Sequence, residues 1–273
     1  MNLKRRRFVG GLGAFGAAAA TGFSIGKVSA ATPVKLTLPW LPLGTYSYVF
    51  VAKRLGYFEK RGVDVTIDRG FGSTKVCVPV DQGQYDFGLL DLAVMAGCAG
   101  KGLDLTAIAG VWPRSPIGIF SLKELNLTKP KDLEGQSSAS SQVEVSSSFG
   151  RPSSRGPESM PNRSTSSAWI EPGSCARLLT SNSIVGNFFG SIAPTFWANK
   201  IDINAMFYEE YRVKMYGIVL ACKRATPQNK PEICKGVVGG LMEGLKYVYL
   251  NPEKAIDLHI ESLKEFQGGS VKS

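Results

Sequence analysis

The sequence has little of what metal sites and nucleophilic active sites require. His259 is the only histidine among 273 residues, and the five cysteines form no Cys-x-x-Cys pair. A zinc site needs about four closely spaced Cys, His or carboxylate ligands, and an enzymatic nucleophile needs a neighbouring base. We therefore predict no metal site, no cofactor, no catalytic residue and no enzymatic activity. His259 lies among apolar residues, which indicates a role in packing or at the surface.

The cysteines are odd in number and irregular in spacing. They are Cys77, Cys98, Cys175, Cys222 and Cys234. One disulfide would be compatible with an oxidising compartment. Buried free thiols are the interpretation that we favour, because cysteine commonly behaves as a small buried apolar residue.

The sequence also lacks the basic helices and interleaved aromatic residues that are typical of nucleic-acid binding. The formal net charge is +10, from 32 basic and 22 acidic residues. Five of the basic residues fall within residues 1–30, which hold no acidic residue, so the remainder has 27 basic against 22 acidic side chains. This mild excess fits an anionic solute or no particular partner, and we predict no nucleic-acid partner.

Residues 1–30 have the three parts of an export signal. Arg5, Arg6 and Arg7 precede an uncharged run, 9–26, and Val28-Ser29-Ala30 is a small-x-small cleavage pattern. Paired arginines before a Gly/Ala-rich run are typical of twin-arginine export. We predict a cleaved leader of this type and a periplasmic location, with an uncleaved anchor as the alternative.

Strand and helix patterns alternate along residues 34–122. Val63-Asp64-Val65-Thr66-Ile67 alternates apolar and exposed positions, as a half-buried strand does. Strands are predicted at 34–38, 63–67, 86–90, 105–111 and 117–122, and helices at 45–56, from 74, at 91–101, at 229–250 and from 252. This order indicates an α/β fold with parallel pairing.

The composition changes abruptly in the middle of the chain. Residues 137–167 contain 13 serines and neither Leu nor Ile. Such a segment has too little apolar surface to offset the entropy of ordering it. We predict a disordered or aberrant low-complexity segment at 136–168. A shifted reading frame is our hypothesis for its origin, and a genuine flexible insertion is the alternative.

Several segments, in this order, resemble a known family. They are Trp40-Leu41-Pro42-Leu43-Gly44, Ala52-Lys53-Arg54-Leu55-Gly56-Tyr57-Phe58-Glu59, Gly62-Val63-Asp64-Val65, Gly70-Phe71-Gly72-Ser73, Gly83-Gln84-Tyr85-Asp86-Phe87-Gly88, Pro130-Lys131-Asp132-Leu133-Glu134-Gly135 and Asn251-Pro252-Glu253-Lys254-Ala255. Together they resemble the substrate-binding proteins of ABC importers for sulfonates, nitrate, taurine or thiamine-type pyrimidines.

The resemblance implies a two-lobed periplasmic binding protein fold of type II, with mixed sheets flanked by helices. Lobe one would comprise 31–122 and 217–273, and lobe two 123–216, with crossings near Ser121 and Gly217. It also implies a monomer that closes by hinge motion around a small anionic or heteroaromatic solute. The partner would be an ABC permease in the membrane.

The ligand is expected where strands lead into helices. The predicted ligand-binding residues are Trp40, Thr45, Tyr46, Gly72, Ser73, Asp91, Trp112, Arg114 and Asn187. Aromatic rings among them suit a flat ligand, whereas the glycine loop and Arg114 suit an anion. Thr45 and Asp91 could instead cap the helices that follow them.

Two alternatives to a binding protein remain open. An enzyme of thiamine-pyrimidine synthesis has the same fold, but it needs an active-site histidine and a cysteine-rich motif, and it has no export leader. The second alternative is a defective family member that no longer binds ligand because the serine-rich segment replaces the start of lobe two.

Overall fold

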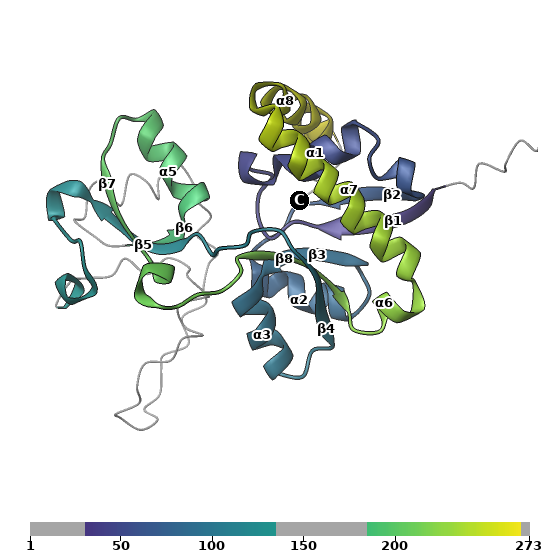
Figure 1. The fold of residues 1–273 in the computed structure, drawn as a ribbon, viewed down its shortest axis with the longest axis horizontal. Coiled ribbons are helices and arrows are strands. Elements are labelled where there is room, and N and C mark those ends of the chain that lie inside the picture. The colour runs from purple at the N-terminus through teal and green to yellow at the C-terminus, as the bar shows by residue number, and fades with distance from the viewer. Residues whose placement is uncertain (1–30, 135–184, 269–273) are drawn as a thin grey trace, which may run out of the picture. The chain divides into compact units, whose positions relative to one another are not determined.

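The computed structural model describes residues 31–134 and 185–268 (Figure 1). The serine-rich segment, Cys175 and the predicted leader lie outside these ranges. The strands are β1 (Thr32–Thr37), β2 (Val63–Asp68), β3 (Phe87–Asp91), β4 (Leu105–Gly110), β5 (Ile117–Leu122), β6 (Val185–Phe188), β7 (Ile203–Phe207) and β8 (Ile218–Lys223). The α-helices are α1 (Ser47–Arg54), α2 (Ser73–Asp81), α3 (Leu92–Gly100), α5 (Phe189–Ala198), α6 (Thr226–Asn229), α7 (Pro231–Leu250) and α8 (Pro252–Gly268). Short 3-10 helices are η1 (Gly44–Tyr46), η2 (Glu59–Arg61), η3 (Lys123–Leu125), η4 (Pro130–Leu133) and η5 (Tyr208–Tyr211).

The larger sheet has five strands in the order β2-β1-β3-β8-β4. Strand β1 pairs in parallel with β2 and β3, whereas β8 runs antiparallel to β3 and β4. Along β2, Val63 and Val65 are buried and Asp64 is exposed, as the alternation predicted. The predicted mixed α/β class is therefore confirmed.

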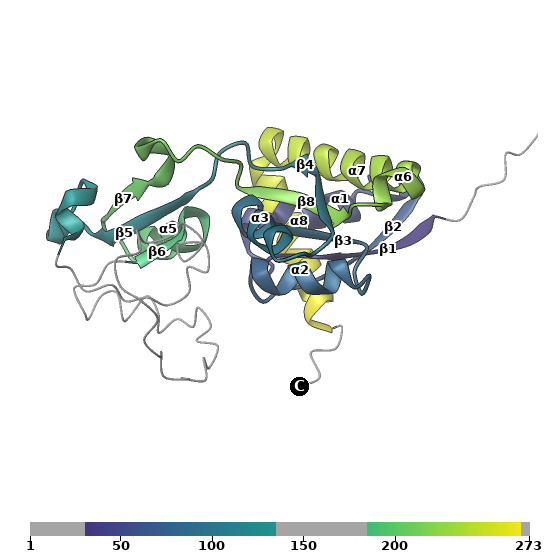
Figure 2. The ribbon, with the colours of Figure 1, turned by 90° about the horizontal axis from the view of Figure 1, so that it is seen from below.

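Helices cover both faces of this sheet (Figure 2). On one face, α1 and α7 pack against β1 and β2 through a core that includes Tyr48, Val237 and Leu241. On the other face, α2 and α3 form a second core through Val76 and Val94. Helix α8 packs on α1, where Arg54 forms ion pairs with Glu261 and Glu265 at 2.9 and 2.6 Å. The sheet is thus the middle layer of three.

The smaller sheet is antiparallel, with the order β6-β5-β7. Its core contains Phe120, Leu122 and Phe196, and Phe207 contacts Phe120 edge-on. We expected 117–122 in lobe one, but strand pairing places β5 in this sheet. The predicted crossing near Ser121 is wrong, because the chain leaves the larger sheet after Gly110 and enters the smaller one at Ile117. The division into two lobes stays a prediction.

Two chain segments run side by side next to the larger sheet. The Ser115 N–H donates to the Met215 carbonyl at 3.0 Å, and the Gly217 N–H donates to the Trp112 carbonyl at 3.0 Å. Each segment links a strand of one sheet to a strand of the other. Hinge motions commonly occur in short connecting segments, and the predicted hinge closure stays a prediction.

The cysteines differ in part from the interpretation that we favoured. Cys77 on α2 and Cys98 on α3 form a disulfide, so their assignment as free thiols is wrong. Sequence spacing did not reveal this bond, because it depends on the packing of two helices against each other. Cys222 and Cys234 are free and buried, as predicted.

Candidate functional site

The predicted site residues lie mainly where the parallel strands of the larger sheet end. The loops after β1 and β2 are tied together, because the Gly70 N–H donates to the Trp40 carbonyl at 3.0 Å and the Gly72 N–H to the Pro39 carbonyl at 2.8 Å. The last residue of the neighbouring strand β3 is Asp91. Carboxyl ends of parallel strands share one edge of a sheet, which is the usual ligand position in open α/β folds.

Asp91 is a completely buried carboxylate at this edge. Its Oδ1 accepts the Ala93 N–H at 2.9 Å and the Val94 N–H at 3.4 Å, so the predicted capping of α3 is confirmed. Its Oδ2 is buried and accepts no hydrogen bond within the described residues. Burial raises the pKa of Asp91 to about 6, against the lowering effect of the two backbone N–H groups. Within the described residues, Oδ1 of Asp91 therefore has hydrogen-bond donors and Oδ2 has none.

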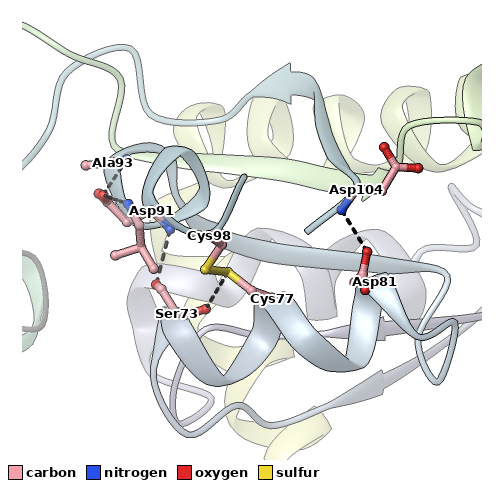
Figure 3. Close-up of a disulfide and its surroundings, with 8 residues drawn as sticks. Ser73, Cys77, Asp81, Asp91, Ala93, Cys98 and Asp104 are labelled. Carbon is pink, nitrogen blue, oxygen red and sulfur yellow. Dashed lines mark hydrogen bonds between the residues drawn. A yellow bond between two sulfur atoms is a disulfide. The ribbon is translucent and has the colours of Figure 1, made fainter. Parts of the chain in front are cut away.

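Ser73 and Gly72 lie beside Asp91. The Ser73 Oγ accepts the Asp91 backbone N–H at 3.1 Å, which joins the start of α2 to the end of β3 (Figure 3). Gly72 has φ +113°, a conformation that side chains other than hydrogen rarely allow. Gly72 thus permits the turn of the loop, and Ser73 ties the loop to Asp91.

Aromatic rings lie at the same edge. Tyr46 on η1 stacks on Trp112, with ring centroids 6.0 Å apart and an interplanar angle of 8°. The pKa of Tyr46 is raised, first by burial and then by the negative charge of Asp91, so its phenol group lies within electrostatic reach of that carboxylate. The Thr45 hydroxyl is buried without a hydrogen-bond partner in the described residues, and neither η1 nor α1 has a side-chain cap. The expectation that Thr45 caps the helix is wrong, because Leu43 and Tyr46 occupy the capping positions.

Two predicted residues are not brought to this group. The Arg114 side chain is 80% exposed, and its Nε forms an ion pair with Glu209 of η5 at 3.4 Å. Asn187 lies on β6, in register with Gly118 of β5 in the smaller sheet. Their roles as ligand-binding residues stay predictions.

Arg69 was missed by the sequence reasoning. It follows β2 directly and precedes the glycine loop, and its guanidinium lies over the Phe71 ring at 4.4 Å. Burial lowers its pKa. A basic residue next to a glycine loop after a strand was the available signal, since that arrangement favours anions.

No group of three or more His, Cys, Asp or Glu side chains suited to a metal ion occurs in residues 31–134 and 185–268. A surface hollow lies elsewhere, at the end of β5 and the start of β7. It is lined by Leu122, Lys123, Glu124, Lys200, Ile201 and Asp202, none of which was predicted as a site residue. Over the same described ranges, no helix has the length and apolar character needed to span a membrane.

His259 on α8 is buried, so the packing interpretation is confirmed. Its ring contacts Phe50 edge-on at 5.1 Å, and burial lowers its pKa below the ordinary 6.5, partly offset by the Pro42 backbone. The unfolded chain then takes up this proton at higher pH than the folded protein does.

We therefore expect the contribution of His259 to stability to be complete above pH 6.5 and to be lost as the pH falls below that value. Chemical denaturation at a series of pH values measures it. His259→Leu should remove this part of the pH dependence and leave the acid loss caused by other groups. Equal slopes in the two proteins between pH 7 and pH 5 would contradict the assignment.

Comparison with known proteins connects the sequence to this fold. Residues 45–149 match the NMT1/THI5 like family. Two 4-amino-5-hydroxymethyl-2-methylpyrimidine phosphate synthases of Saccharomyces cerevisiae, THI11 and THI13, are each 24% identical over 96 residues, which is 35% of this chain and 28% of theirs. The chain therefore matches less than a third of the length of these relatives.

Solved structures cover much more of the chain. The periplasmic aliphatic sulphonate binding protein SsuA of Escherichia coli has a TM-score of 0.60 at 14% identity, covering 86% of this chain and 80% of its own. A putative periplasmic sulfonate-binding protein from Methylobacillus flagellatus has a TM-score of 0.54 at 14% identity, covering 83% and 72%. A Candida albicans gene product with the generic periplasmic binding protein fold has a TM-score of 0.54 at 14% identity, covering 86% and 80%. The predicted resemblance is confirmed: the chain has the fold of the periplasmic binding proteins and carries an NMT1/THI5-like segment at residues 45–149.

Proposed function

We propose that this protein is the extracytoplasmic solute-binding subunit of an ABC importer and that it captures a small heteroaromatic solute that carries an N–H donor. The fold of the periplasmic binding proteins supports a solute-binding role. The twin-arginine type of leader supports delivery outside the cytoplasm, where a permease would receive the solute. The protein would act as a monomer.

The observation that carries the choice of ligand is the second oxygen of Asp91. A buried acceptor without a hydrogen bond costs free energy, and such groups in folded proteins usually have a partner. An amino group on a ligand ring would supply the missing donor to Oδ2. The ring of Trp112, on which Tyr46 stacks, lies at the same edge and suits a flat ring.

Binding requires a side chain to move. Asp91 Oδ2 is enclosed in this structure, so a ligand reaches it only when a neighbour is displaced. We assign this movement to Tyr46, which interacts electrostatically with Asp91 and sits on the short helix η1 rather than in a long element. If the ring of the ligand takes the place of the Tyr46 ring, one aromatic contact replaces another and little packing energy is lost.

A sulfonate is the second candidate ligand, and nitrate belongs to the same class. Arg69 and the backbone of the glycine loop favour an anion, and two of the similar structures are described as sulfonate-binding proteins. Asp91 disfavours an anion, because at neutral pH an ionised carboxylate would repel it. The heteroaromatic class therefore comes first.

The enzyme alternative rests on the two yeast synthases. An active-site histidine would be needed, and His259 is buried between α1 and α8 against Phe50. The match to the synthases covers 28% of their length, so most of the synthase chain has no counterpart in it. A binding protein without catalysis is thus the better proposal.

Thermal unfolding with a ligand panel tests the proposal. We expect one cooperative transition whose midpoint rises with an aminopyrimidine at a concentration well above its dissociation constant, because only a ligand that prefers the native state shifts the transition. Alkanesulfonates, nitrate and bicarbonate complete the panel. A rise with sulfonates alone would overturn the ligand class. A protein without a cooperative transition in any condition would be the defective family member.

A further inference from the structure

One face of α2 contacts the segment that carries Asp91 at three successive turns. Ser73, Cys77 and Asp81 are spaced four residues apart and so lie on the same side of the helix. The Ser73 Oγ accepts the Asp91 N–H at 3.1 Å, Cys77 is bonded to Cys98, and the Asp81 Oδ1 accepts the Asp104 N–H at 2.8 Å (Figure 3). These contacts reach, in order, the end of β3, the helix α3 and the start of β4.

The disulfide is the covalent member of this series. Cys77 lies one turn after Ser73, and Cys98 lies two turns after Asp91, near the end of α3. Both cysteines are buried in the apolar cluster formed with Val76, Val80 and Val94. The bond therefore fixes the position of α3 relative to α2, while the Ser73–Asp91 hydrogen bond fixes the ends of the same two elements.

We propose that the Cys77–Cys98 disulfide is a positioning element for the Asp91 carboxylate, and that it holds Oδ2 in the enclosed place from which it accepts the ligand donor. This inference rests on the proposed function. In it, the disulfide acts through Asp91 and does not itself contact the solute.

The start of α3 is held to the neighbouring chain by the Leu92 N–H, which donates to the Gly217 carbonyl at 3.0 Å, whereas the disulfide is the covalent link from α3 to α2. Helix α3 itself contains no charged side chain, so no ion pair of its own ties it to α2. A cross-link restricts how far two helices can separate or slide. Without it, α3 can shift along α2, and water then reaches the carboxylate. Placement within about 0.5 Å matters for a site of this kind.

Among the described residues, burial and backbone hydrogen bonds set the pKa of Asp91. Tyr46 of η1 interacts with it electrostatically, and this phenol is neutral at ordinary pH, the more so because its pKa is raised. On α2, Lys75 is exposed to solvent near the helix start. A change in the titration of Asp91 therefore reports its burial and hydrogen bonds.

The first arm of the test needs no ligand. Carbon-13 NMR of the side-chain carboxyl groups follows Asp91 through a pH titration of the full-length protein, with Asp91→Asn to assign the signal. Cys77→Ala/Cys98→Ala should lower the midpoint from about 6 toward the ordinary 3.8, because water enters the site. The matched control is Cys222→Ala/Cys234→Ala, which removes two buried thiols, one on β8 and one on α7, and should leave the midpoint unchanged.

The second arm measures binding of an aminopyrimidine by calorimetry. The Cys77→Ala/Cys98→Ala protein should bind about tenfold more weakly than the oxidised protein, and the control pair should bind as the wild type does. Suppose that the wild type binds no ligand of the panel, but the Asp91 midpoint is shifted in the variant. The proposed function would then be wrong, and the positioning role of the disulfide would stand.

An Asp91 midpoint that is the same in the folded variant and the wild type would overturn the inference. Cys77→Val/Cys98→Ala, which restores apolar volume, replaces the first variant if that one does not fold cooperatively. Failure of both variants to fold would also overturn it, because the bond would then hold the whole domain rather than one side chain.

Discussion

Asp91→Asn is expected to weaken binding of an aminopyrimidine by about a hundredfold and, at pH 7.5, to raise the stability of the ligand-free protein. Asparagine caps helices as well as aspartate does, so α3 keeps its first turn. In the variant an amide N–H₂ replaces Oδ2, and a donor then faces the donor of the ligand. The loss of a hydrogen bond to a charged group, together with this mismatch, accounts for the size of the effect.

The stability gain follows from the raised pKa of Asp91. Because the folded pKa of about 6 lies above the ordinary 3.8, the folded state binds the proton more tightly than the unfolded chain does. This contribution to stability is complete below pH 3.8 and is lost as the pH rises through 6. At pH 7.5 the ionised, buried carboxylate therefore costs free energy, of which we expect Asp91→Asn to recover ~1 kcal/mol, since its amide also lacks a partner.

Isothermal calorimetry measures the affinity, and denaturant unfolding at pH 7.5 and pH 5 measures the stability. Asp64→Asn is the matched control, because Asp64 is exposed on β2 and its carboxylate should be worth little. Unchanged affinity in Asp91→Asn would remove Asp91 from the site. A gain in stability that is as large at pH 5 as at pH 7.5 would contradict the titration argument.

Gly70→Ala is expected to destabilise the protein by ~2–3 kcal/mol and to disturb the site at the same time. A Cβ at this position would collide with the Leu38 carbonyl oxygen and would lie 2.6 Å from the Pro39 carbonyl carbon. Both are backbone atoms, so neither can turn aside. The loop after β2 would have to separate from the loop after β1, and Gly72 and Ser73 would move with it.

Denaturant unfolding and ligand calorimetry on the same samples check this expectation. The control is Gly44→Ala, at an exposed glycine of η1 where a Cβ meets nothing within 4 Å. It should leave both stability and affinity close to those of the wild type. If Gly70→Ala were as stable as Gly44→Ala, the two loops would not be held together as tightly as their hydrogen bonds indicate.

Local pattern was enough to predict much of the larger sheet. The alternation at Val63 and Val65 marked β2, the spacing of Val237 and Leu241 marked α7, and Asn251-Pro252 marked the start of α8. The capping role of Asp91 could be predicted because a cap position directly after a strand is a short-range signal. The resemblance then predicted the class of fold.

Long-range relations could not be predicted from the same patterns. Strand β5 has the sequence of an ordinary buried strand, and nothing local states which sheet it joins. The Cys77–Cys98 bond spans 21 residues and depends on how two helices pack. Likewise, the ion pair between the Arg114 Nε and a carboxylate oxygen of Glu209, at 3.4 Å, joins residues that lie far apart along the chain. Tertiary packing determines the sheet that β5 joins, the disulfide and the ion pair alike.

The most direct measurement is the carbon-13 titration of the Asp91 carboxyl in the free protein and in the protein saturated with an aminopyrimidine. A ligand N–H that donates to Oδ2 stabilises the ionised form, so we predict a clearly lower Asp91 pKa in the complex than the value of about 6 in the free protein. Identical titrations in the free and the saturated protein would contradict the claim that this carboxylate receives the ligand.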